Sequence, residues 1–583
     1  MKKQKPKVGP PQVPSIFSIL KPYSKMIALL ATLSVAGNGL SLWLPKVISH
    51  AIDAFGHRTL VLSDVAWQFG LLSGAIFILT YLQNIVQTFA SERVAKDMRN
   101  ALATKISRQS HAFVQSVTAS KLLTNITSDI DSVKLFVAQA ISSLISSLFL
   151  ILGASVLLLL TNWRLALVVL LVVPIIAVTF FLTLRQVRSL FFKSREVIDR
   201  LNRVINESIL GAALIRVLNS QKPEHKKFAV ANQESQDLGL QIVRIFAGLI
   251  PAISFTANLS TLVILALGGH YIINGSMSLG DFAAFTTYLT ILIFPILVVG
   301  FMSNVIAQAT ASYGRIAEVL NSTEPKEEGA ITSTLKGDVE VKDLTVKYGD
   351  KSALKDVSFA VKAGSKTAII GPTAAGKTQL LYVLTGLLQP ASGEVLFDGH
   401  SIDEYDKTSL HQQVGFVFQD SIVFNMSLRE NIAFSTDVSD ENMQKAIETA
   451  ELSDLISSLP DGLKTVISER GTSLSGGQKQ RLMLARALAL NPRVLLLDDF
   501  TARVDTVTET KILKNIEKNY TGLTLISVTQ KVSSVKAYDQ IILLMEGELL
   551  AHGTHKDLLK DSPEYAQIYT SQQSTNTYEL QPQ

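Results

Sequence analysis

Six long apolar segments constrain the fold of this chain more than any other feature of its sequence. They lie at about residues 24–46, 64–90, 135–161, 163–185, 246–274 and 279–305. Stretches such as Ile151–Leu160 are nearly uncharged, and with their flanks they reach the ~20 residues that a helix needs to cross a bilayer. Apolar residues make up 47% of the chain and charged residues only 18%, which is not typical of a soluble enzyme or a disordered protein. The sequence therefore predicts an all-α six-span transmembrane domain.

The connections between these spans differ in length and charge. Residues 91–134 and 186–245 are long and rich in Lys and Arg, whereas Thr161–Arg164 holds one basic residue and Asn274–Leu279 none. The positive-inside rule places the long connections and both termini in the cytoplasm. Parts of them, such as Ala90–Ser107, lack Pro and Gly and repeat apolar residues at helical spacing. We expect the spans to continue as helices into the cytoplasm, although separate short helices would also fit.

The composition excludes several kinds of chemistry. The chain has no Cys, so disulfides, thiolate metal sites and Cys nucleophiles are ruled out. The net charge of +5 fits basic cytoplasmic loops of a membrane protein. A positive charge could also indicate an ATPase that acts on nucleic acid. The six apolar spans argue against that function, and we expect no nucleic-acid partner.

A phosphate-binding motif lies in the second half of the chain. The run GPTAAGKT at 371–378 fits G-x-x-x-x-G-K-[ST], follows an apolar strand and precedes a helical run from Gln379. Backbone N–H groups and the helix N-terminus would bind phosphate oxygens. Lys377 would add a charge at the β- and γ-phosphates, and Thr378 would offer its hydroxyl to Mg²⁺. A second apolar strand ends in Asp498, which is well placed to hold Mg²⁺ through water.

The segment Leu474–Gln478 reads LSGGQ and lies between these two strands. With the phosphate loop and Asp498, it makes residues 338–570 resemble the ATP-binding cassette (ABC) family, and the six-span region fits the exporter type of that family. The resemblance implies an α/β P-loop ATP-binding cassette domain that binds ATP and Mg²⁺. It also implies that two cassettes pair head to tail. Each ATP would then lie between the Walker motifs of one chain and the signature of the other. Here Walker A is the phosphate loop at 371–378, Walker B is the strand that ends in Asp498, and the signature is Leu474–Gln478.

The resemblance also divides the chain into parts. We expect an N-terminal tail and interfacial helix at 1–23, the transmembrane domain with long cytoplasmic extensions at 24–320, a linker at 321–337, the nucleotide-binding domain at 338–570 and a C-terminal tail at 571–583.

Individual roles follow from the resemblance. Tyr348 corresponds to the aromatic residue that stacks on adenine, Gln419 to a glutamine that contacts Mg²⁺, and Asp505 to an aspartate at the dimer seam, although each would also fit an ordinary surface position. The implied nucleotide-binding residues are Tyr348, Gly371, Thr373, Ala375, Gly376, Lys377, Thr378, Gln379, Ser475, Gly476, Gly477, Gln478 and Asp505. The implied Mg²⁺ ligands are Thr378, Gln419 and Asp498.

Three further segments resemble parts of the family that touch neighbouring domains. Ser120–Asp129, at the turn of the first long connection, and Gly211–Arg216 resemble the two coupling helices. Glu469–Gly471 resembles the segment that precedes the signature. A solvated helix–turn–helix is the alternative for the first two.

Three departures from the family pattern fall in the nucleotide site. Where the family has a catalytic Glu, the chain has Asp499, whose carboxylate is one methylene shorter. The switch His is replaced by Gln530, which can hydrogen-bond but cannot carry a proton charge. A Walker A glycine is replaced by Ala374. Asp499, Gln530 and Gln419 are thus the predicted catalytic positions, and the first two form a degenerate set that binds ATP and hydrolyses it poorly.

The intact signature beside this degenerate site predicts an asymmetric dimer. The pattern resembles the degenerate-site subunit of bacterial heterodimeric ABC exporters, which implies a different half-transporter chain as partner and a multi-pass location in the bacterial inner membrane. The uncharged spans suit amphipathic drugs or lipids. The alternative is a non-hydrolysing regulatory ATP-binding subunit that gates its partner. Polar residues such as Asn38, Gln83 and Tyr288 would either line a cavity or bridge helices.

Overall fold

The structure is a computed structural model, and it describes residues 16–324, 329–349, 351–434, 438–467 and 474–579. The chain divides into two compact units, 1–107 with 118–322, and 108–117 with 323–583. Of the expected N-terminal tail and interfacial helix at 1–23, residues 1–15 lie outside the described residues, as does the segment Glu469–Gly471.

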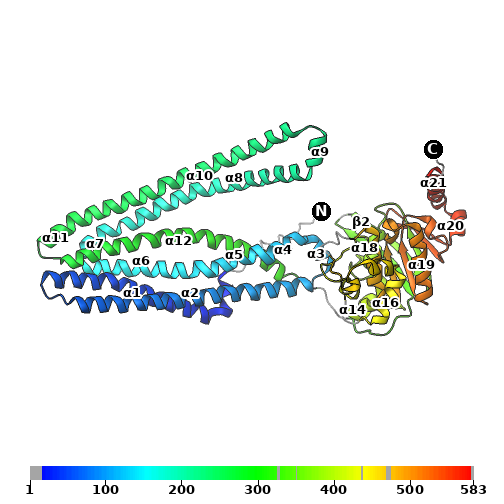
Figure 1. Cartoon of the computed structure of the whole chain (residues 1–583), viewed down its shortest axis with the longest axis horizontal. Coiled ribbons are helices and arrows are strands. Elements are labelled where there is room, and N and C mark those ends of the chain that lie inside the picture. The colour runs from blue at the N-terminus through cyan, green and yellow to red at the C-terminus, as the bar shows by residue number, and fades with distance from the viewer. Residues whose placement is uncertain (1–15, 325–328, 350, 435–437, 468–473, 580–583) are drawn as a thin grey trace, which may run out of the picture. The chain divides into compact units, whose positions relative to one another are not determined.

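The first unit consists of helices only (Figure 1). Its elements are η1 (Ile16–Tyr23), α1 (Ser24–Gly56), α2 (Leu62–Ser107), α4 (Ala119–Thr124), η2 (Asn125–Asp129), α5 (Ile130–Leu135), η3 (Phe136–Ala140), α6 (Ile141–Thr161), α7 (Trp163–Leu170), α8 (Val172–Leu210), α9 (Ala212–Val217), α10 (Gln221–Val263), η4 (Ile264–Gly268), α11 (Gly269–Ile273) and α12 (Leu279–Leu320). Here η1 is a 3₁₀ helix, and η2, η3 and η4 are π-helical turns that interrupt longer helices.

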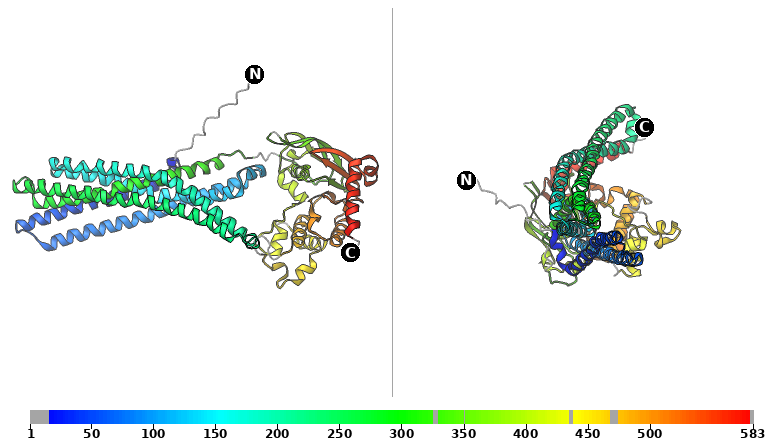
Figure 2. Two further views of the ribbon diagram at one scale, coloured as in Figure 1. Left: turned by 90° about the horizontal axis from the view of Figure 1, so that it is seen from above. Right: turned by 90° about the vertical axis from the view of Figure 1, so that its left-hand side faces the viewer.

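The six predicted spans correspond to six long helical runs. Each is long and apolar enough to cross a membrane. The expectation that spans continue as helices is also confirmed, because α2 is unbroken over 46 residues and α8 over 39. Figure 1 and Figure 2 show α8 and α10 running side by side as far as α9, apart from the other long helices at that end.

Polar residues within the first unit bridge helices. Asn38 on α1 donates through Nδ2 to Ser146 Oγ on α6 at 2.9 Å, and Gln83 on α2 donates to Ser142 Oγ at 2.6 Å. The Tyr288 hydroxyl on α12 donates to the backbone oxygen of Leu42 at 3.0 Å. Of the two roles weighed for these side chains, helix bridging is the one that their contacts fill.

The end of α1 is tied to the start of α12. The Asp53 carboxylate accepts from the Gly280 N–H at 2.8 Å and from the Ser278 hydroxyl at 2.7 Å. Lys46 Nζ lies 3.0 Å from the Asp281 carboxylate. The Gly280 bond satisfies one of the free N–H groups of the first turn of α12, and Asp53 and Asp281 place negative charge at its N-terminus, where the helix dipole favours it.

The opposite end of the first unit is held by a half-buried ion pair. The Arg315 guanidinium on α12 binds the Asp129 carboxylate through two bonds, one of them 3.0 Å from Nε, and Asp129 is buried. Lys121 and Glu318 add a longer, exposed pair. A bidentate pair fixes the angle between two helices as well as their distance.

The first proposed coupling segment is wrong in position. Residues 120–129 lie inside the third long helix, in α4 and η2, and not at a turn. The turn is made by α3 (His111–Val117). Thr118, the next residue, has φ +68° and precedes α4. This short helix clusters with the second unit, where the His111 ring stands 5.3 Å from the Tyr382 ring. The second segment does lie at a turn, as α9 between α8 and α10.

The second unit is built on two sheets. The four-stranded antiparallel sheet has the order β2 (Lys351–Val361), β1 (Val339–Tyr348), β4 (Ser392–Phe397) and β5 (His400–Ser401). The six-stranded sheet has the order β10 (Glu548–Gly553), β9 (Gln540–Met545), β3 (Lys366–Ile370), β8 (Thr524–Val528), β7 (Val494–Asp498) and β6 (Val414–Val417), and the strands from β9 to β6 are parallel.

The remaining regular elements described in the second unit are helices. They are α13 (Lys377–Leu384), η5 (Ile402–Glu404), α14 (Lys407–Gln413), α15 (Leu428–Ala433), α16 (Asp440–Thr449), α17 (Ser453–Ser458), η6 (Gly462–Lys464), α18 (Gly476–Leu488), η8 (Phe500–Arg503), α19 (Thr506–Asn519), η9 (Val532–Ser534), α20 (His555–Asp561) and α21 (Pro563–Glu579). Among them, α18 contacts β6 of the larger sheet and η5 contacts β4 of the smaller one. Along β7, Leu495 and Leu497 join the core that α18 and α19 share, while Leu496 joins the core of the smaller sheet. This alternation follows from the two-residue period of a strand.

The structure moves two of the expected domain boundaries. Within the expected linker, Leu335 is buried in the core of the nucleotide-binding unit and Ile331 bridges Tyr405, so residues from 329 on pack with that unit. The expected C-terminal tail starts inside α21, which continues to Glu579. Both differences arise because tertiary contacts, such as the burial of Leu335, extend into segments that are mostly polar.

Candidate nucleotide-binding site

The phosphate loop joins β3 to α13 at the carboxyl edge of the parallel sheet. Gly371 has no room for a side chain, because a Cβ there would lie 2.1 Å from the backbone oxygen of Leu544. Gly376 caps α13 with φ +94°, and a Cβ would meet the Ala353 oxygen at 2.5 Å. Ala374 also has a positive φ, +67°, which costs an L-residue about 1–2 kcal/mol relative to glycine. Ala374 therefore keeps the loop conformation that a glycine would adopt, at an energetic cost.

Lys377 is the first residue of α13, and its ammonium group turns back over the loop. Nζ donates to the backbone oxygens of Gly371 at 2.8 Å and Pro372 at 2.7 Å. Burial lowers the pKa of Lys377, and the carboxylates of Asp499 and Asp498 oppose that shift. A buried cation bonded only to neutral carbonyls is suited to an anionic ligand.

Asp498 lies at the end of β7 and is 2% exposed. Burial raises its pKa, and a hydrogen bond from the Thr378 side chain and the charge of Lys377 work in the opposite direction. Its Oδ2 atom has no hydrogen-bond partner within the described chain. An orphaned carboxylate oxygen beside a threonine hydroxyl fits the oxygen ligands that Mg²⁺ prefers, so Thr378 and Asp498 would hold the ion that the P-loop fold implies.

Asp499 follows directly, with its backbone in the left-handed region at φ +46°. Its N–H donates to the Val528 oxygen at 3.0 Å, which fixes the Cα relative to β8. Burial raises the pKa of Asp499, while Lys377 and Lys531 lower it. Because the backbone is anchored, the reach of this side chain is set by its own length.

Gln419 follows the end of β6 and Gln530 follows the end of β8, the two strands that flank β7 in the sheet. Val417 pairs with Leu497 and Val528 pairs with Asp498, so β6, β7 and β8 end at one level. Gln419 and Gln530 are both exposed. The structure thus brings the phosphate loop, Asp498, Asp499 and these two glutamines to one edge of the sheet.

The signature residues form the start of α18. Ser475 is the N-cap, and its hydroxyl accepts from the Gln478 N–H at 3.3 Å while Gln478 Oε1 accepts from the Ser475 N–H at 2.8 Å. A Cβ on Gly477 would lie 2.8 Å from the backbone oxygen of Arg503, and one on Gly476 3.2 Å from its side chain. The two glycines therefore allow η8 to pack closely against α18. In the described part of the chain, no contact found joins the signature to Lys377 or Thr378.

The remaining predicted positions are spread around the loop. Tyr348 ends β1 and is 50% exposed. Asp505 is the N-cap of α19 and accepts from the Thr508 N–H at 2.9 Å, which lowers its pKa. Thr373 is exposed, Gln379 is half-buried on α13, and the Ala375 N–H donates to the Pro372 oxygen at 3.3 Å.

The structure adds residues that the motifs did not single out. The charge of Lys531 lowers the pKa of Asp499, which burial raises. Arg503 packs against Gly476 and Gly477 of the signature. Gln572 on α21 contacts the switch segment, residues 529–531, from forty residues away in sequence. Lys531 directly follows Gln530, and Arg503 lies two residues before Asp505, so predicted site residues lie close to both in the sequence. No motif lies near Gln572.

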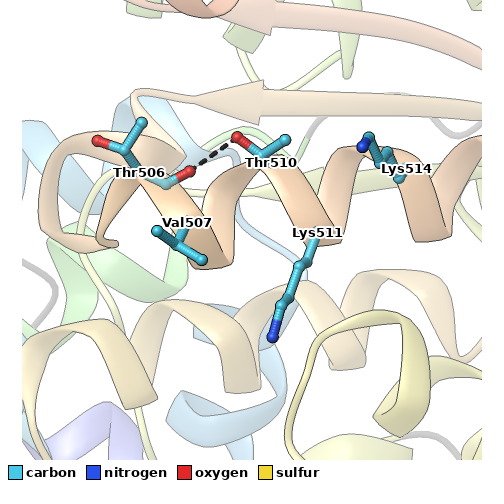
Figure 3. Close-up of a pocket in the computed structure, with 5 residues that line it drawn as sticks. All are labelled: Thr506, Val507, Thr510, Lys511 and Lys514. Atoms are coloured by element: carbon cyan, nitrogen blue, oxygen red, sulfur yellow. Dashed lines mark hydrogen bonds between the residues drawn. The ribbon is translucent and has the colours of Figure 1, made fainter.

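A surface hollow of about 320 Å³ lies over α19 (Figure 3). It is lined by Thr506, Val507, Thr510, Lys511 and Lys514. The Thr510 hydroxyl donates to the Thr506 backbone oxygen at 2.8 Å, which keeps it within the helix. The lining comes from one helix, so this hollow is separate from the phosphate loop.

The fold and the site together define a multi-pass membrane protein that carries a P-loop nucleotide-binding domain. Residues 26–296 match the ABC transporter transmembrane region, and residues 354–502 match the ABC transporter ATP-binding domain. The chain belongs to the ABC transporter family, and with one transmembrane region and one ATPase domain it is a half-transporter. The predicted fold class is confirmed.

Similar proteins cover nearly the whole chain. An uncharacterized ABC transporter ATP-binding protein, YfiB of Bacillus subtilis (strain 168), is 32% identical over 565 residues, 95% of this chain and 98% of that protein. An ATP-dependent lipid A-core flippase of Syntrophus aciditrophicus (strain SB) is 29% identical and covers 85% of this chain and 83% of its own length. YheI of B. subtilis (strain 168), a probable multidrug resistance ABC transporter ATP-binding/permease protein, is 28% identical and covers 96% and 98%.

A solved structure shares the fold. A bacterial Atm1-family ABC exporter with ATP bound superposes with a TM-score of 0.76, at 24% identity, over 95% of this chain and 99% of that chain. The chain therefore has the fold of an ABC exporter.

Proposed function

We propose that this chain is one half of an ATP-driven heterodimeric exporter, in which its own nucleotide site holds ATP and hydrolyses it poorly. The observation that carries the proposal is the contrast within one site. The groups that would hold nucleotide, Lys377, Thr378 and Asp498, are buried or half-buried; Lys377 bonds the oxygen of Gly371, and Thr378 bonds Asp498. The two positions that would drive hydrolysis are occupied by Asp499 and Gln530.

The side chains support binding directly. Lys377 is charged and nearly buried among carbonyls, so phosphate oxygens would replace weaker partners. The α13 N-terminus adds its free N–H groups. Mg²⁺, held by Thr378 and Asp498, with Gln419 also predicted as a ligand, would neutralise phosphate charge. Tyr348 would stack on the adenine ring.

Hydrolysis requires a base at the attacking water. The Asp499 backbone is fixed by its bond to Val528, so the carboxylate ends about 1.5 Å short of a glutamate, the length of one carbon–carbon bond. A misplacement of this size costs on the order of 10²-fold in rate. Gln530 cannot take up the positive charge of a histidine. Both substitutions therefore act on the same step.

The signature supports a partner of a different kind. It is capped and closely packed on Arg503, so it is ready to close another chain's nucleotide site. In a dimer of identical chains both sites would be impaired. A partner with a complete catalytic Glu and His would give one hydrolytic site, which this chain's Ser475–Gln478 would complete, with Asp505 at the seam.

We also propose the direction and the cargo. The basic long connections support a cytoplasmic nucleotide-binding domain and cytoplasmic termini, with the spans in the bacterial inner membrane. Amphipathic drugs or lipids fit the uncharged spans, and the names of two relatives, a lipid A-core flippase and a probable multidrug transporter, agree with this class.

Co-expression with the partner chain tests the proposal. ATP binding and turnover are measured for the isolated chain and for the pair in lipid nanodiscs. The expected result is ATP binding by both and rapid turnover by the pair alone. Substantial turnover by the isolated chain would refute it. Substitution of the polar span residues Asn38, Gln83 and Tyr288 that leaves the transported substrates unchanged would favour the regulatory alternative.

A further inference from the structure

The C-terminal helix reaches the switch segment through one side chain. Gln572 Nε2 donates to the backbone oxygen of Gln530 at 2.7 Å, and Gln572 Oε1 accepts from the backbone N–H of Val532 at 3.0 Å. One amide thus satisfies a carbonyl and an N–H on either side of Lys531. This two-point contact fixes the backbone between them in position and in orientation.

The helix that carries Gln572 is itself anchored to the domain core. Tyr565 is fully buried, and its hydroxyl lies 2.7 Å from His555 Nδ1. Lys536 Nζ donates to the Tyr569 hydroxyl at 2.9 Å and lies 4.6 Å from the centre of that ring. Tyr565, Tyr569 and Gln572 share one face of α21, because they are spaced by four and three residues. The anchoring residues therefore aim Gln572 at the switch segment.

The same helix holds the chain on both sides of η9. Gln572 contacts the residues before and at its start, and Tyr569 contacts Lys536 just after its end. On the other side, the Thr529 N–H donates to the Ile369 oxygen at 3.2 Å, next to the phosphate loop. The switch segment therefore lies between a support from the phosphate-loop strand and one from α21.

We infer that Gln572 is a positioning residue, which holds Gln530 and Lys531 at the nucleotide site from the C-terminal helix. Lys531 carries the charge that opposes the effect of burial on Asp499, so a displaced switch segment would change the electrostatics of the site as well as its contact to nucleotide. The inference rests on the proposed function, in which this site retains ATP. It adds that retention depends on a side chain outside every motif.

The variant Gln572→Met tests this contact. Methionine has similar length and helix propensity but neither donates nor accepts as the amide does. The matched control is Gln567→Met, an exposed glutamine on the same helix. Gln572→Glu keeps the acceptor for Val532 and loses the donor for Gln530, and serves as the second variant if Met fails to fold.

The experiment uses the full chain with its partner in nanodiscs. Hydrogen exchange of residues 529–535, without nucleotide, should rise about 25-fold in Gln572→Met, which loses two bonds, since each lost bond is worth about fivefold. It should rise less in Gln572→Glu and not in Gln567→Met. Release of a fluorescent ATP analogue from this site should quicken several-fold in the same order.

Three results would overturn the inference. They are unchanged exchange in Gln572→Met, an equal rise in Gln567→Met, or faster exchange with unchanged release of the analogue. A wild-type site that binds no analogue would instead refute the proposed function, and the exchange measured without nucleotide would still decide whether Gln572 holds the loop.

Discussion

Lengthening one side chain should restore hydrolysis at this site. In Asp499→Glu the carboxylate moves outward by one carbon–carbon bond, about 1.5 Å. The backbone stays in place, because the bond from residue 499 N–H to Val528 is made by the main chain. A misplacement near 1 Å costs on the order of 10²-fold, which corresponds to about 2.7 kcal/mol of activation free energy. We therefore expect a rise of up to ~10²-fold, and a further rise when Gln530→His is added.

The assay is ATP turnover by the co-expressed pair, with the partner's own Walker A lysine replaced so that only this site can react. Glutamate at φ +46° is less favourable than aspartate, which tolerates the left-handed region better, so thermal unfolding is measured alongside. Asp499→Asn is the control and should lower turnover further if the aspartate acts as a slow base.

The reasoning fails if the double variant Asp499→Glu with Gln530→His binds ATP with unchanged affinity and turns over no faster. In that case side-chain reach would not be the limit. The cause would then have to lie in dimer closure or in the partner's signature.

The other predictions concern the loop, the metal ligand and the signature. Ala374→Gly relieves about 1–2 kcal/mol of backbone strain and gives back about 0.4–1 kcal/mol through the unfolded chain, so thermal unfolding of the nucleotide-binding domain should shift upward or stay level, and a clear downward shift would contradict the strain. Burial raises the pKa of Asp498, so Mg²⁺-dependent ATP binding should weaken as pH falls, starting above the pH at which aspartate ordinarily titrates. Calorimetry in buffers of different ionisation enthalpy should detect the proton that Asp498 releases when Mg²⁺ and ATP bind. Asp498→Asn should abolish that release. In Gly477→Ala a Cβ would lie 2.8 Å from the Arg503 oxygen, so turnover at the partner's site should fall at least tenfold while ATP binding at Lys377 persists, and unchanged turnover would rule out a role for this close packing.

The sequence predicted those parts of the fold that depend on local patterns. The six spans were visible because apolar residues have to be continuous over a bilayer. The phosphate loop was visible because its glycines are required by close backbone contacts, as at Gly371 and Gly376. These features need no knowledge of distant residues.

The errors arose where tertiary contacts decide. The turn after α2 was placed at 120–129, whereas it lies at α3. Helical spacing runs through this region without Gly or Pro, so the pattern could not locate the turn. The contact of Gln572 with Gln530 joins residues 42 positions apart, and the pair of Arg315 with Asp129 joins residues 186 positions apart. Neither pair carries a local signal.

The composition of the purified assembly tests the central claim most directly. The chain is isolated from its native membranes, the intact complex is weighed by native mass spectrometry, and its ATP turnover is measured in the same preparation. The account predicts a one-to-one complex with a different half-transporter chain, with nucleotide retained at this chain's site. A complex of two identical copies that turns over ATP rapidly would contradict it.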